Sequence, residues 1–375
     1  MIYKKLARHL DDLPGGFPET KSGVELRILR RMFTPEQARL ALKLTLIPEQ
    51  TDVIAKRAKI PVKKASDLLE QMAKKGLIYR LKRKGQPARF MAVQFVIGIW
   101  ELHVNDLDPD LIRDFNEYAP TLFDFDEWKK APQLRTIPVE QSIRADLEVL
   151  PYEDAAKLIQ SRSKFLEAPC ICRKERRIMG EGCGKTEGNC LIMGVGVEIY
   201  KNVGIGKEIS QKQALELIKK ADKEGLVLQA SFSKKIANIC CCCGCCCQVL
   251  KSFKKHAMPS SLVASAFVAQ WDPDACTGCG ECVDRCQMDA IRMDDGIAVL
   301  DADKCIGCGL CVSSCSSQAL FLKRKPGPES PKIPEKLTHA AVKRLRVRGK
   351  LGRGKVSSLL LRSQKARPFS KGKRA

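Results

Sequence analysis

The cysteines are the residues of this chain best suited to chemistry. The 375-residue sequence contains 19 of them, and all lie between Cys170 and Cys315. Because the N-terminus lacks the apolar core of a secretory signal, we expect a cytoplasmic protein whose cysteines bind metal rather than form disulfides. Thiolates are soft ligands, so iron–sulfur clusters and zinc are the expected cofactors.

Eight of these cysteines form two runs with the same spacing, Cys-x2-Cys-x2-Cys-x3-Cys, and the second run follows the first by 29 residues. This spacing is typical of bacterial two-cluster ferredoxins, in which the fourth cysteine of each run binds the other cluster. We therefore predict two 4Fe–4S clusters. The expected ligands of one cluster are Cys276, Cys279, Cys282 and Cys315, and those of the other are Cys305, Cys308, Cys311 and Cys286. Zinc ribbons also use Cys-x2-Cys pairs, but they require neither the third and fourth cysteines nor the crossed repeat.

One detail departs from the usual run. Ferredoxins of this kind place proline after the fourth cysteine, whereas Gln287 and Ser316 stand there in this chain. The substitutions leave the ligands intact, so we expect them to change the rigidity of the loops and the reduction potentials rather than cluster binding.

A second group of cysteines precedes the ferredoxin runs. Four of them lie in a loop rich in glycine and charge, and seven more occupy residues 240–247 around Gly244. We predict an additional metal site, either a third iron–sulfur cluster or zinc, with the better-spaced set as ligands: Cys170, Cys172, Cys183 and Cys190. A thiol–disulfide or sulfur-carrying role and a purely structural role are the alternatives. The role of residues 240–247 stays open at this stage.

The segments that must position these cysteines differ in pattern. After an N-terminal extension (residues 1–33), residues 34–100 predict three helices, at 34–46, 50–58 and 61–76, followed by strands at 77–81 and 90–96. This is the order of a winged-helix domain. The lysines of the third helix would enter a DNA groove, or would simply form a solvated face of a docking or dimerisation domain.

The remaining segments complete the expected α+β fold. Residues 101–265 form a mixed, cysteine-rich middle domain, residues 266–322 a small ferredoxin-like domain, and residues 323–375 a basic disordered tail. From Phe321 onward, 18 Lys and Arg face two Glu, so 18 − 2 = +16 of the net charge of +23 lies there. Such a tail suits nucleic acid, an acidic redox partner or an anionic membrane surface, or only keeps the chain soluble. No apolar run reaches the length of a membrane-spanning helix.

Several motifs make the chain resemble a known family. Leu150-Pro151-Tyr152-Glu153, Ala168-Pro169-Cys170-Ile171-Cys172-Arg173 and residues 239–247, followed by two ferredoxin runs, are similar to 4Fe–4S binding proteins of anaerobic bacteria and archaea. The resemblance spans about residues 34–322, and a winged-helix-like N-terminal segment is common in that family. Cys241 stands where such relatives often have asparagine. The resemblance implies electron transfer.

These patterns favour an electron carrier, or an electron-transfer subunit of an anaerobic oxidoreductase, that passes single electrons to or from a redox partner protein. The sequence offers neither a nucleotide-binding loop nor a Ser/His/Asp or paired-carboxylate constellation, so an autonomous enzyme is the less favoured interpretation. The alternatives are a redox-sensing DNA-binding regulator that uses the winged-helix segment, and a reductase with its substrate at the upstream cysteines.

Overall fold

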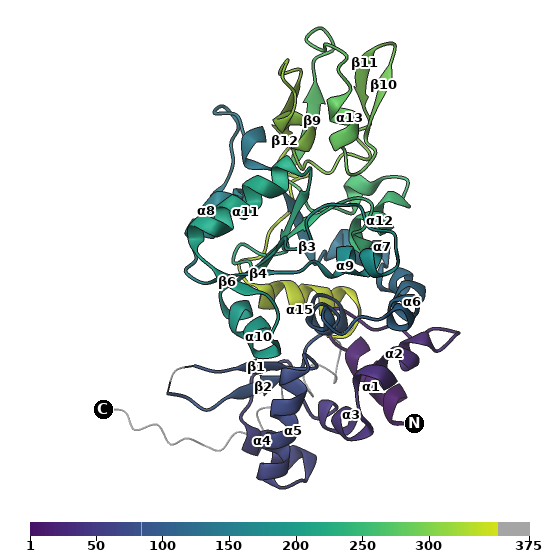
Figure 1. Ribbon diagram of the computed structural model, residues 1–375, viewed down its shortest axis with the longest axis vertical. Coiled ribbons are helices and arrows are strands. Elements are labelled where there is room, and N and C mark those ends of the chain that lie inside the picture. The colour runs from purple at the N-terminus through teal and green to yellow at the C-terminus, as the bar shows by residue number, and fades with distance from the viewer. Residues whose placement is uncertain (84, 352–375) are drawn as a thin grey trace. The chain divides into compact units, whose positions relative to one another are not determined.

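The protein is described here from a computed structural model that covers residues 1–83 and 85–351 (Figure 1). The fold is α+β, as the sequence predicts. The chain forms two compact units. The first, called the N-terminal unit, comprises residues 1–122 and 198–205 and the described residues from 345 onward. The second, called the cysteine unit, comprises residues 123–197 and 206–344 and contains every cysteine.

The N-terminal unit is mainly helical. Thr34 caps one of its helices through a capping box with Gln37, and Pro35 occupies the first turn, as the sequence predicts. Three helices are followed by an antiparallel hairpin, which is the predicted order of elements. The elements are α1 (Ile2–Asp11), α2 (Val24–Met32), α3 (Pro35–Ala41), α4 (Thr51–Ala58), α5 (Val62–Lys74), β1 (Tyr79–Leu81), β2 (Arg89–Met91) and α6 (Pro109–Tyr118).

Buried aromatic residues hold the N-terminal unit together. Trp100 stacks on Phe115 with 3.8 Å between the ring centroids, and Phe17 packs edge-on against Phe95 at 4.7 Å. Phe17 lies in the segment around Gly15 and Gly16 where proline and glycine exclude a continuous helix, and its burial fixes that segment over the core.

The cysteine unit is built on a six-stranded antiparallel sheet with the order β3-β7-β8-β5-β4-β6. Strand β7 is buried along its whole length, as expected for a central strand with both faces covered. The strands are β3 (Leu134–Ile137), β4 (Phe165–Ala168), β5 (Cys190–Met193), β6 (Lys207–Ile209), β7 (Val227–Ser231) and β8 (Asn238–Cys242). The helices of this unit before the ferredoxin part are α7 (Phe125–Lys130), α8 (Ala155–Gln160), α9 (Ile171–Ile178), α11 (Gln211–Lys223) and α12 (Gln248–Lys254). Helix α10 (Val195–Val203) belongs mostly to the N-terminal unit.

Residues 266–322 of the cysteine unit, here called the ferredoxin part, contain two copies of one arrangement of helix and strand. In each copy a short helix follows two cysteines of the run, and a strand follows the last cysteine. Strand β12 pairs with β9 and strand β11 pairs with β10, both antiparallel. The elements are β9 (Phe267–Trp271), α13 (Glu281–Arg285), β10 (Ile291–Asp294), β11 (Ile297–Leu300), α14 (Leu310–Ser313) and β12 (Leu320–Arg324).

A partly buried ion pair joins the ferredoxin part to helix α11. Arg285 donates to the carboxylate of Asp222 at 2.8 Å, and Ser313 donates to the same oxygen at 2.8 Å. Arg285 also donates to the backbone carbonyls of Leu310 and Lys223. Because Arg285 and Ser313 come from helix α13 and the end of α14, one carboxylate holds both halves of the repeat.

The basic C-terminal segment contains more structure than its composition predicts. Helix α15 (Leu337–Val347) lies within the stretch expected to be disordered. Arg344 of this helix is buried, donates to the carbonyl of Ala131 at 2.7 Å and lies over the ring of Trp128. Together with the buried side chain of Leu345, these contacts pack the helix in a way that composition alone does not reveal. Residues 352–375 of the predicted tail lie outside the described residues.

Replacing Asp222 tests whether this carboxylate holds the ferredoxin part in place. We expect Asp222→Ala to lower the free energy of unfolding by about 2–3 kcal/mol, because Arg285 then keeps only neutral acceptors. Arg292→Ala, which removes the exposed Arg292–Asp294 pair of the same part, is the matched control and costs less than about 1 kcal/mol. Urea unfolding under anaerobic conditions measures both variants. Equal losses in the two variants would contradict the role of Asp222.

Candidate metal centres

Four cysteine side chains line one cavity in the ferredoxin part, here called the first pocket: Cys276, Cys279, Cys282 and Cys315. These are the four thiols predicted to share a cluster, and the last of them comes from the opposite run. Cys279 is exposed and Cys282 is buried, so one edge of the pocket faces solvent. Trp271 and Leu320, from the paired strands β9 and β12, form part of the apolar wall.

The other four ferredoxin thiols line a second cavity, here called the second pocket: Cys286, Cys305, Cys308 and Cys311. Cys305 and Cys311 are buried. The backbone N–H of Val139 donates to the carbonyl of Cys308 at 3.0 Å, which ties the loop to the segment that follows strand β3. Two thiols of the second pocket are therefore buried and its loop is anchored to the rest of the cysteine unit, whereas the first pocket reaches solvent at Cys279.

Glycine shapes the loops that carry these thiols. Gly278 and Gly307 occupy equivalent places in the two runs, with φ of +72° and +65°. A Cβ on Gly278 would lie 2.3 Å from the carbonyl oxygen of Gly296, and one on Gly307 would lie 2.1 Å from that of Phe267. Only glycine fits both the backbone angle and the close approach. Each loop can thus turn tightly enough to present successive thiols to one cavity.

Backbone N–H groups point at the ferredoxin sulfurs. Ala290 donates to Sγ of Cys286 at 3.2 Å, and Ala269 donates to Sγ of Cys305 at 3.4 Å. Hydrogen bonds from the backbone of Ala298 and Gly278 lower the pKa of Cys276. Donors of this kind stabilise thiolates and the sulfurs of a bound cluster, and they tune its potential.

In the second pocket, burial raises the pKa values of the thiols, in contrast to the hydrogen bonds that lower the pKa of Cys276. Desolvation raises the pKa of Cys308 to about 12, and it also raises the pKa of Cys305 and of Cys311. Four thiolates so close together in a low-dielectric site need a strong positive charge as compensation. Iron ions supply that charge, so the donor set fits a cluster better than it fits free thiols.

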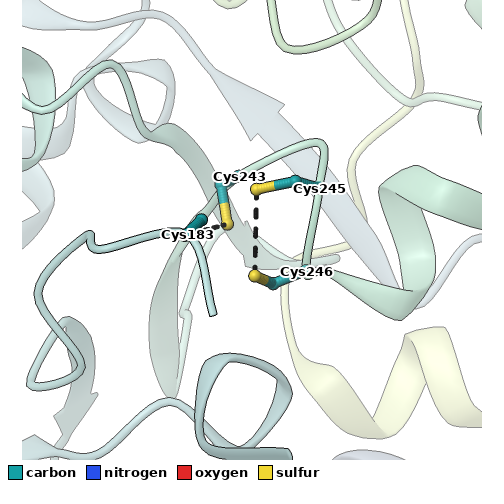
Figure 2. Close-up of side chains that lie close together, drawn as sticks. All are labelled: Cys183, Cys243, Cys245 and Cys246. Carbon is teal, nitrogen blue, oxygen red and sulfur yellow. Dashed lines mark hydrogen bonds between the residues drawn. The ribbon is translucent and has the colours of Figure 1, made fainter. Parts of the chain in front are cut away.

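A further group of four thiols lies outside the ferredoxin part and is here called the upstream thiol group: Cys183, Cys243, Cys245 and Cys246. All four sulfurs lie within 4.8 Å of one another, and Figure 2 shows them gathered around a common point. The Sγ–Sγ distance is 3.9 Å between Cys183 and Cys243, and 3.8 Å between Cys245 and Cys246. Cys183 comes from the loop after helix α9, whereas the other three come from the turn after strand β8.

The structure divides the four upstream cysteines predicted to form one site. Only Cys183 belongs to the upstream thiol group. Cys170 and Cys172, at the start of helix α9, are hydrogen-bonded to each other, and Cys172 also meets Cys247. Cys190 lies opposite Cys240 in the β5–β8 ladder. Neighbours in the fold, rather than spacing along the chain, therefore decide which thiols meet.

A buried arginine lies among the upstream thiols. The side chain of Arg173 is 3% exposed, and its guanidinium donates to the carbonyl of Cys241 at 2.9 Å and approaches Sγ of Cys243 at 3.9 Å. Its Nε and Nη2 have no hydrogen-bond partner among the described residues. Burial raises the pKa of Cys243, but the backbone N–H of Cys246 and the charge of Arg173 outweigh it, so the net pKa is lowered. Arg173 thus favours the thiolate form of Cys243.

The turn of residues 243–246 touches the ferredoxin part directly. The backbone N–H of Gly244 donates to the side-chain oxygen of Gln287 at 2.8 Å. A Cβ on Gly244 would lie 2.1 Å from the carbonyl oxygen of Gln287. Gln287 follows Cys286 and stands where proline is usual, and its amide makes a contact that proline cannot make. The upstream thiol group is therefore a neighbour of the second pocket.

Comparisons with known proteins agree with this geometry. Residues 269–316 match the model of a family described as a 4Fe-4S dicluster domain. A comparison with curated proteins and one with solved structures give no match. The matched segment includes all eight thiols of the two pockets, so the chain is an iron–sulfur protein. No helix among residues 1–83 and 85–351 is long and apolar enough to cross a membrane.

Two glycine substitutions test the close packing of the second pocket. Both Gly307→Ala and Gly280→Ala bear the cost of a left-handed backbone, about 1 kcal/mol. Only Gly307→Ala adds a clash, because nothing lies within 4 Å of a Cβ on Gly280. We expect Gly307→Ala to lose about four of about eight irons per chain, and Gly280→Ala to keep them. Iron analysis of both variants, purified anaerobically, measures this difference. Equal iron contents would contradict the claim that close packing at Gly307 is needed for the second cluster.

Proposed function

We propose that this iron–sulfur protein transfers single electrons through two 4Fe–4S clusters, one in each ferredoxin pocket. The observation that carries the proposal is the pair of four-thiol cavities inside the segment that matches the dicluster domain. The proposed ligands are the eight cysteines that line the two pockets. A cluster of this type supplies one-electron chemistry, and the protein's own residues hold it and set its surroundings.

The closeness of the two pockets supports a relay. The charge of Cys282, from the first pocket, acts on Cys311 of the second. The short helices α13 and α14 that carry them pack against each other, and Arg285 bridges them by donating to the carbonyl of Leu310 at 3.1 Å. Neighbouring one-electron centres held this rigidly suit electron transfer, because little in the protein has to move.

The two pockets differ in their exposure to solvent, and this difference suggests the path that electrons take through the protein. Cys279 reaches solvent at the first pocket, so we propose that a redox partner protein docks there. The second pocket, with two buried thiols, would be the inner station. An anaerobic oxidoreductase is the proposed partner class. We propose an electron carrier or electron-transfer subunit rather than an autonomous enzyme, since thiols and apolar side chains make up most of the lining of both pockets among the described residues.

Paired alanine substitutions test the crossed ligand assignment. Cys276→Ala should reduce the iron content from about eight to about four per chain. Adding Cys315→Ala should cause no further loss, because both thiols line the first pocket. Adding Cys286→Ala instead should remove nearly all iron, because that thiol lines the second pocket. Cys241→Ala, a buried cysteine outside both pockets, is the control and keeps about eight irons.

The opposite pattern of losses would contradict the assignment. If each run held its own cluster, the Cys276/Cys286 double variant would keep about four irons, and the Cys276/Cys315 variant would lose nearly all of them. Iron and acid-labile sulfide measured on the same samples distinguish bound clusters from adventitious iron.

A DNA-binding regulator receives less support. Helix α5 carries exposed Lys63 and Lys64, but Lys64 pairs with Glu36 at 2.7 Å, and Gln71 is the only base-reading amide on that helix. We expect no sequence-selective retardation of the DNA upstream of the coding region at moderate salt, where charge-driven binding fades. Selective retardation that persists there and is lost in Lys63→Glu would favour the regulator instead.

A further inference from the structure

We infer that the upstream thiol group binds a single zinc ion through Cys183, Cys243, Cys245 and Cys246, separate from the two ferredoxin clusters. The inference does not rest on the proposed electron transfer, since it comes from the distances between four sulfurs and from their surroundings. Figure 2 shows the arrangement.

The spacing of the sulfurs fits one ion. Zinc bound by four thiolates is tetrahedral with Zn–S bonds of about 2.3 Å, which places the sulfurs roughly 3.8 Å apart. The Sγ–Sγ distances of 3.9 Å and 3.8 Å match that value, and no pair of sulfurs in the group lies more than 4.8 Å apart. A modest contraction of the longer pairs would complete the tetrahedron.

The ferredoxin pockets provide an internal comparison. In a 4Fe–4S cluster each thiolate binds a different iron, so its sulfurs stand farther apart than four sulfurs on one ion. Among the described residues, no three ferredoxin cysteines converge within 4.8 Å, although four of them line each cavity. The same chain thus contains two kinds of four-thiol arrangement, an open one and a contracted one, and only the contracted one has the size of a single ion.

The charges around the group also fit a metal-bound tetrathiolate. Four thiolates and one divalent ion carry a net charge of about −2, which is costly to bury without a partner. The buried guanidinium of Arg173 supplies a positive charge 3.9 Å from Cys243, and its Nε and Nη2 find no other partner among the described residues. The backbone N–H of Cys246 adds a donor toward Cys243. Binding would release the thiol protons to solvent.

Such an ion would stabilise the structure by cross-linking two segments of the chain. It would link the loop after helix α9 to the turn after strand β8, two segments that are 60 residues apart at Cys183 and Cys243. That turn holds Gly244 against Gln287, the residue next to Cys286 of the second pocket. Zinc has no redox chemistry of its own, so it would fix the surroundings of the inner cluster without taking an electron.

Metal analysis of the full-length protein, purified anaerobically, tests the inference. We expect about one zinc per chain in addition to the cluster iron, and a zinc-edge X-ray absorption spectrum with four sulfurs at about 2.3 Å. Two matched serine variants then locate it. Cys245→Ser should lose the zinc, whereas Cys190→Ser should keep it, because Cys190 faces Cys240 rather than the group.

Each contrary result has a clear meaning. Loss of zinc from Cys190→Ser with retention in Cys245→Ser would place the ion in a different set of thiols and overturn the assignment. About twelve irons with matching sulfide and no zinc would show a third cluster and also overturn it. Because Cys245 is exposed, its serine variant should fold, and unchanged cluster iron in that variant confirms this. Failure of the electron-transfer proposal would appear in the iron and sulfide instead, so the two outcomes are distinguishable.

Discussion

The rest of this structure depends on how negative charge on sulfur is tolerated in a poorly solvated interior. Twelve thiols gather in three groups of four, and each group becomes costly once its cysteines ionise. Burial alone opposes this, as the raised pKa of Cys308 shows. Backbone N–H donors at Cys276 and Cys286 and the buried guanidinium of Arg173 offset part of this cost, and the metal ions that we propose for each group would offset the rest.

The same requirement explains why the ferredoxin part does not stand alone. Its second pocket has buried thiols, and its loops are anchored to the rest of the cysteine unit through Val139 and the turn at Gly244. Asp222 of helix α11 then holds both halves of the repeat through Arg285 and Ser313. The segments that follow strands β3 and β8 therefore support the ferredoxin part beside the second pocket, whereas the first pocket keeps an exposed edge at Cys279.

The sequence predicted the contacts that form within one turn or loop, but not those between segments that only the fold brings together. Three thiols of each pocket, among them Cys276 and Cys279, come from one tight loop, so their spacing along the chain predicts that they lie together. The fourth thiol, such as Cys315, comes from the other run, and the repeat of the whole motif rather than local spacing indicated it. Capping residues such as Thr34 likewise act within one turn. The partners of Cys183 arise from loops that the sheet brings together, and no spacing rule contains that information. Helix α15 was missed for a similar reason, since the buried contact of Arg344 with Ala131 joins distant segments.

The most direct test of two adjacent electron-transferring clusters is an anaerobic redox titration followed by electron paramagnetic resonance. We expect full reduction to produce about two unpaired spins per chain, with a spectrum broadened and split by the interaction between neighbouring clusters. Partial reduction should give the simpler spectrum of one reduced cluster. A fully reduced protein with no paramagnetic signal, or with a single isolated cluster spectrum, would contradict the claim that both pockets carry electrons.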